Sequence, residues 1–266
     1  MRIKYYLNLW KEFTRLNIET WAEYRMNFII GIIAMFLSNF VSIVMYWTIF
    51  QNIVEINGWT FWQIVFLSGL AAISIGIWHA FLAGIAPWSF DKYLRKGGFD
   101  RLLVQPANPF LSLIANGLDY GGIGDLVAGI IITYYGATMS GIVFTLQNTL
   151  LLMSMVFGGA IIFFSATFFV CTLSFWVTRS DSLNEIIWSL MKFIDMPLSI
   201  YSPILTFFLT FIVPFGFINY YPAQLLLGKG ETAAFGYLTP IIGIVVFMLA
   251  YKFWKIGVKN YSSTGS

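Results

Sequence analysis

Charged residues are scarce in this chain, since Lys, Arg, Asp and Glu make up only 10% of its 266 residues. Soluble domains carry about a quarter charged residues, whereas hydrophobic residues here reach 59% and the mean hydropathy is +0.78. This balance excludes a soluble protein. The sequence predicts an all-α integral membrane protein with about six spans of roughly 20 residues each, which form a single transmembrane domain over residues 1–266.

Cysteine and histidine are almost absent, with one Cys171 and one His79. An intrachain disulfide is therefore excluded, and a His or Cys metal site lacks partners. No Gly-x-x-x-x-Gly-Lys-Ser/Thr loop is present to bind nucleotide phosphates, and the nearest string, residues 228–232, is interpreted as an outer turn. We expect no catalytic residue, no metal and no cofactor in this chain.

The N-terminal segment, residues 1–26, mixes Lys and Arg with Glu around apolar residues that recur near helical spacing. This pattern is typical of an amphipathic helix lying in the membrane interface. A charged leader without that role is the alternative. The segment lacks the short apolar core and small-residue cleavage site of a secretory signal, so we expect it to be retained.

Long apolar runs predict spans at about residues 27–50, 59–86, 111–136, 146–177 and 235–254. With one further crossing, thirteen of the fifteen Lys and Arg fall on the same side. The positive-inside rule assigns that side to the cytoplasm. The sequence thus predicts a multi-pass protein of the cell membrane with both termini inside.

The remaining crossing has two possible layouts. Residues 178–196 are polar, whereas residues 200–227 are apolar but broken by Pro203, Pro214 and Pro222. Either the polar stretch lies on the cytoplasmic surface and the second stretch spans, or the polar stretch crosses and the second dips into the outer leaflet and returns. Non-helical backbone is tolerated at membrane depth only where it is buried in protein or lines a water-filled cavity. We therefore favour the re-entrant layout.

Two motifs give the chain a family resemblance. One runs from Tyr93-Leu94-Arg95 through Gly97, Asp100, Leu103 and Pro106, and the other is Pro214-Phe215-Gly216-Phe217-Ile218-Asn219-Tyr220-Tyr221-Pro222-Ala223. With the order of interfacial helix, spans and basic turn, they make the chain resemble the permease subunits of ABC-2-type exporters. The motifs match a small subfamily whose transported molecules are mostly unassigned.

The resemblance implies a transport subunit without its own motor. In such permeases the cytoplasmic segment between spans 2 and 3, here residues 87–109, forms a coupling helix that docks on an ABC ATPase, which carries the ATP and Mg²⁺. Its docking residues would be Tyr93, Leu94, Arg95, Gly97, Asp100, Leu103 and Pro106. The permease would pair with a second copy or with a related permease, and the loop after the fifth span would be re-entrant.

The chemistry of residues 87–109 agrees with docking. Tyr93, Leu94, Leu102 and Leu103 can supply an apolar contact, while Arg95 and Asp100 can form a charged rim and Gly97-Gly98 permits a close backbone approach. The alternative is that Lys92, Arg95, Lys96 and Arg101 hold anionic lipid head groups.

Ionisable residues inside spans cost about 2.5–3.5 kcal/mol on insertion scales, so each one invites a functional explanation. Glu185, Lys192 and Asp195 would line a translocation path if residues 178–196 cross the membrane, and would be solvated if they do not. His79 is interpreted as an interior histidine whose bonds are satisfied. Asp119 and Asp125 are expected at the interface, with glycines 121, 122 and 124 able to break the helix between them.

The leading hypothesis is a non-catalytic permease subunit of an ATP-driven exporter. Few charges are available to line a path, which favours an amphiphilic or apolar passenger over a free ion. The alternatives are a membrane enzyme acting on a lipid-linked substrate, with Asp100, Asp119, Asp125 and His79 as its polar groups, and a membrane anchor for a soluble partner. Nothing in the sequence indicates nucleic-acid binding.

Overall fold

The computed structural model describes residues 2–86, 90, 93–94, 96–115, 117–177 and 181–262. Among them, five helical segments are long and apolar enough to cross a membrane. They are α2 (Arg25–Phe50), α3 (Phe61–Phe81), α7 (Gly121–Met139), α8 (Leu146–Leu173), and 3₁₀ helix η6 (Ala233–Leu238) continued by α12 (Thr239–Asn260). This confirms an all-α integral membrane protein.

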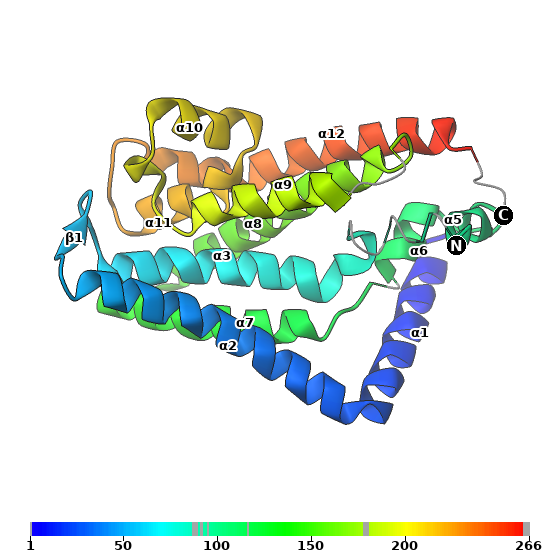
Figure 1. Ribbon diagram of the computed structural model, residues 1–266, viewed down its shortest axis with the longest axis horizontal. Coiled ribbons are helices and arrows are strands. Elements are labelled where there is room, and N and C mark those ends of the chain that lie inside the picture. The colour runs from blue at the N-terminus through cyan, green and yellow to red at the C-terminus, as the bar shows by residue number, and fades with distance from the viewer. Residues whose placement is uncertain are drawn as a thin grey trace.

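The long helices lie side by side along the longest axis of the molecule (Figure 1). One end of this bundle carries the start of α1 (Arg2–Glu23), the end of α12, and the short helices α5 (Gly98–Leu103) and α6 (Pro109–Ala115). The opposite end carries the hairpin of β1 (Glu55–Ile56) and β2 (Trp59–Thr60). The end that carries α5 is the one the positive-inside rule assigns to the cytoplasm.

Helix α1 lies crosswise to the bundle at the α5 end (Figure 1). Its first residue in the structure, Arg2, is near α5, and a single turn at Tyr24 separates its last residue, Glu23, from α2. A helix in the membrane plane has this orientation relative to spans. The interfacial position of residues 1–26 stays a prediction, because the structure contains no bilayer.

Helices α3 and α7 pack backbone against backbone. Gly122, Gly129 and Gly136 recur every seven residues along α7 and face α3. A methyl group on Gly129 would lie 2.7 Å from the Ile73 nitrogen, and one on Gly136 would lie 2.6 Å from the Phe66 Cα. Small residues of this kind let helices approach closely in membranes, where van der Waals packing drives association. Glycines 121, 122 and 124 form the first turn of α7, so the helix is interrupted just before them and Asp119 lies outside it.

The third span is shorter than the predicted 111–136. Helix α6 ends at Ala115, residues 117–120 are non-helical, and α7 begins at Gly121. The cause is a close backbone contact between Gly117 and Gly84, which follows α3. The Asp119 amide also donates to the Ala80 carbonyl at 3.2 Å. Residues 117–120 are thus held against the end of α3, and the helix cannot continue through them.

The polar stretch forms α9 (Asp181–Met191), followed by the 3₁₀ turn η2 (Lys192–Ile194). Helix α9 runs alongside α3 and α8 (Figure 1), and its Trp188 ring lies 6.0 Å from the Phe163 ring of α8. This orientation corresponds to the second of the two predicted layouts, in which residues 178–196 cross the membrane.

Residues 200–227 form a bent helical pair at the hairpin end. A short 3₁₀ turn, η3 (Leu198–Ile200), leads into α10 (Pro203–Phe207), which continues as the π-helix η4 (Phe208–Ile212). After Pro214 the chain forms η5 (Phe215–Phe217) and α11 (Tyr220–Leu226), and its axis bends by 78° between the two halves. Pro203 occupies the first turn of α10, where a missing amide hydrogen costs nothing. A bend of this size occurs both in a broken span and in a re-entrant segment, so the re-entrant layout stays a prediction.

Candidate functional site

Helix α5 is the central element of the predicted docking segment, residues 87–109. It follows Gly97, whose φ of +65° lies in the left-handed region that favours glycine. This turn reverses the chain just before α5. Pro87, Lys92 and Arg95 lie outside the described residues, so the predicted role of Arg95 stays an expectation.

Phe99 anchors α5 to the bundle. Its side chain is 0% exposed, and its ring centroid lies 5.2 Å from Phe175, 5.8 Å from Trp254 and 5.1 Å from Tyr261. Phe175 follows α8, and Trp254 belongs to α12. One aromatic side chain therefore joins the docking segment to the ends of two spans. Sequence reasoning missed Phe99, although its position directly after Gly97-Gly98 was a signal.

Burial divides the predicted docking residues into two groups. Leu94 is 4% and Leu102 8% exposed, so both pack against this chain, and the expectation that they contact a partner is corrected. Leu103 is 43% and Val104 85% exposed, so both are free to contact a partner. Val104 was not among the docking residues predicted from the sequence. We define the docking surface as the exposed residues at the α5 tip: Lys96, Arg101, Leu103, Val104, Gln105 and Pro106.

Asp100 points toward the C-terminal end of α12 as well as toward solvent. Burial and the nearby Asp100 carboxylate raise the pKa of the Tyr261 hydroxyl, which follows α12. On the other side, burial raises the pKa of the half-buried Tyr93, and the positive charge of Arg101 opposes this shift. Asp100 is thus half-buried beside Tyr261, which does not match the free charged rim expected from the sequence.

His79, Asp119 and Asp125, three of the polar groups assigned to the alternative membrane enzyme, come together at the C-terminal end of α3. His79 Nδ1 lies 2.8 Å from Asp125 Oδ2, and His79 Nε2 lies 3.7 Å from Asp119 Oδ1. Asn39 of α2 donates from Nδ2 to Asp125 Oδ1 at 2.8 Å. We call these four residues the charged cluster. It ties α2, α3, α7 and the 117–120 segment together.

The two acidic residues of the charged cluster differ in exposure. The Asp119 side chain is 45% exposed, as the expected interfacial position requires, whereas the Asp125 side chain is 14% exposed and lies inside α7. Asp125 is therefore enclosed between helices, and its position at the membrane interface stays a prediction. The His79 side chain, 15% exposed, is an interior histidine with a bonded partner, as predicted.

The predicted path residues share one face of the α9 segment. Ile187, Met191 and Ile194 are buried toward the bundle. The residues Glu185, Lys192 and Asp195 are exposed on the surface of the described chain. Charged residues at this depth need a polar path or a partner subunit. Their role in translocation stays a prediction.

Asn219 connects the bent helical pair to the bundle. Its side chain is 0% exposed, and Nδ2 donates to the Ile194 carbonyl at 2.7 Å and to the Leu67 carbonyl at 3.3 Å. These bonds connect the segment after Pro214 to η2 and to α3. The motif that contains Asn219 was recognised in the sequence, but only its prolines were assigned a role.

The comparisons with known proteins give one family. A family model described as an ABC-2 family transporter protein matches residues 24–265, which is nearly the whole chain. No curated protein matches the chain, and no solved structure does.

Proposed function

Because the chain belongs to the ABC-2 family of transporter proteins, we propose that it is the permease subunit of an ATP-driven exporter. Membership of this family makes the chain a transport subunit and not an enzyme. ATP hydrolysis would then occur on a separate ABC ATPase. Two permeases, identical or related, would enclose the path.

The observation that carries the proposal is the position of α5. Its exposed tip presents Leu103 and Val104 together with the positive charges of Lys96 and Arg101, while Phe99 is fully buried. An exposed apolar centre with a charged rim is the usual anatomy of a protein interface. The buried side reaches α8 and α12, so a displacement of the tip is transmitted to two spans.

The proposed passenger is amphiphilic or hydrophobic and leaves the cytoplasm or the inner leaflet. Few charged residues are available on the spans, and Glu185, Lys192 and Asp195 are the exposed charges of the α9 segment. A path with so few charges favours apolar molecules over free ions. If the reconstituted complex were stimulated only by a small hydrophilic solute, this part of the proposal would fail.

The docking role is tested by Leu103→Asp in the full chain reconstituted with its ABC ATPase. A charge at the apolar centre of an interface is expected to lower binding of the ATPase by at least tenfold, since hot-spot residues contribute about 2 kcal/mol or more. Asp100→Lys should also abolish coupled hydrolysis, because it reverses the charge beside Tyr261.

The matched control is Val54→Asp, which places the same charge on an 88% exposed residue beside the β hairpin. This end is predicted to face outward, so ATPase binding should not change. Equal binding by Leu103→Asp and the control would contradict the docking assignment.

A further inference from the structure

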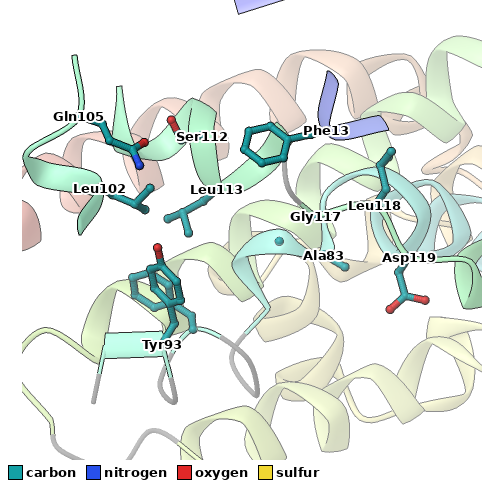
Figure 2. A pocket seen from close by; sticks show the side chains of 12 residues that line it. Phe13, Ala83, Tyr93, Leu102, Gln105, Ser112, Leu113, Gly117, Leu118 and Asp119 are labelled. Carbon is teal, nitrogen blue, oxygen red and sulfur yellow. The ribbon is translucent and has the colours of Figure 1, made fainter. Parts of the chain in front are cut away.

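A cavity lies at the cytoplasmic end of the bundle, between α1, α6 and the docking segment (Figure 2). Its volume is about 440 Å³, within the range of about 300–1,000 Å³ typical of small-molecule sites. Figure 2 shows Phe13 of α1 and Tyr93 of the docking segment on opposite sides, with Asp119 at one end. The residues that line it are Phe13, Ala83, Gly84, Phe90, Tyr93, Leu102, Gln105, Ser112, Leu113, Gly117, Leu118 and Asp119.

Two polar features indicate that this cavity accepts a ligand. Ser112 is 4% exposed, and its hydroxyl has no hydrogen-bond partner within the described chain. Burying a hydroxyl without a partner costs free energy, so a group that fills the cavity and meets Ser112 would recover it. Gln105 lies at the same end of the cavity as Ser112 (Figure 2).

The described part of the cavity lining is acidic. Among the described residues that line it, Asp119 carries a negative charge and none is Lys or Arg. Asp119 Oδ1 accepts a hydrogen bond from the Gly121 amide at 2.7 Å, and its side chain stays 45% exposed. The carboxylate can therefore meet a ligand without losing its present bond.

The other residues of the charged cluster strengthen the preference of the cavity for a cation. Asp119 and Asp125 share one His79, and among the described residues neither carboxylate forms an ion pair with Lys or Arg. Even a protonated His79 balances one carboxylate and leaves the second uncompensated. A cation beside Asp119 would complete the charge balance.

We propose that this cavity binds an amphiphile with a cationic, phosphate-free head group. The head would lie against Asp119, and the apolar chain would lie along Phe13, Leu113 and Leu118, which leaves the Ser112 hydroxyl to water or to a second polar group of the ligand. A phosphate is disfavoured beside Asp119 because the described lining contains this carboxylate and no basic side chain. This site belongs to one chain and shares Gln105 with the docking surface.

The test measures equilibrium binding of radiolabelled decyltrimethylammonium to the full chain in a nonionic maltoside detergent, without ATPase. We expect saturable binding above that of empty micelles, and at least tenfold weaker competition by decanol, decanoate and lysophosphatidylcholine. Decanol that competes as well as the cation would overturn the proposal, because the cavity would then recognise only the chain. Since no ATPase is present, failure here leaves the docking proposal untouched.

Variants locate the site. Asp119→Asn should weaken binding at least tenfold, Asp119→Glu should restore most of it, and Glu231→Gln, a charge removed at the opposite end, should have no effect. Phe13→Ala should weaken binding without altering the charged cluster. Undiminished binding by both Asp119→Asn and Phe13→Ala would overturn the assignment, provided that each elutes as a single species with wild-type helical content.

Discussion

Removing the Phe99 ring should disconnect the docking segment from the spans while leaving its surface unchanged. Phe99 is 0% exposed and packs against Phe90, Phe175, Trp254 and Tyr261, with centroid distances of 5.1 to 6.1 Å. Truncation of such a buried ring to alanine costs about 3–5 kcal/mol. Helix α5 has six residues, far fewer than the roughly 12–15 that an isolated helix needs. It therefore depends on its packing against the bundle, and the contacts of the buried Gly98 and Leu102 remain when the Phe99 ring is removed.

The assay compares ATPase binding with coupled transport. Phe99→Ala should bind the ATPase with an affinity within about fourfold of wild type, because Leu103 and Val104 remain exposed. Transport per ATP hydrolysed should fall at least tenfold, because the motion of α5 no longer reaches α8 and α12. Leu103→Asp should instead lose binding of the ATPase.

The matched control is Phe169→Ala, which removes the same ring from an α8 position that is 46% exposed. Coupling should stay near the wild-type value in this variant. If Phe99→Ala transported as efficiently as the control while correctly inserted, the idea that Phe99 transmits motion would be refuted.

Three further predictions follow from the packing. Gly129→Leu should prevent stable insertion because a side chain there meets the α3 backbone at 2.7 Å, whereas Ile130→Leu, on the exposed face of α7, should insert normally in a protease-protection assay. A double-mutant cycle of His79→Ala and Asp125→Ala, read by thermal unfolding in detergent, should give a coupling energy of about 1 kcal/mol or more, and strict additivity would contradict the charged cluster. Lys192→Cys should react with an impermeant thiol reagent from outside during turnover if α9 lines the path, and labelling from inside alone would contradict it.

Local composition was sufficient to predict most of the spans. The run that became α2 (Arg25–Phe50) has no charged residue after Arg25, so hydropathy alone defines it. Residues 146–177 were predicted for the same reason, and α8 ends at Leu173. In these segments the membrane imposes one requirement, an apolar helix of sufficient length, and the sequence reports it directly.

Features that depend on contacts distant in sequence were not predictable. The break before α7 is caused by the meeting of Gly84 and Gly117, which hydropathy cannot detect. The burial of Asp125 depends on Asn39 and His79, which lie 86 and 46 residues away in sequence. Residue type likewise could not tell which leucines of residues 87–109 face a partner, because that depends on the rotation that Phe99 imposes on α5.

Cross-linking from the α5 tip to the ATPase is the most direct test of the docking assignment. A photoreactive amino acid at Val104, which is 85% exposed, is introduced into the full chain and reconstituted with its purified ABC ATPase. The account predicts a cross-link to the ATPase that Leu103→Asp abolishes, and no cross-link from the same group at Val54. A cross-link from Val54 but not from Val104, or labelling of Val104→Cys from the outside of intact cells, would contradict it.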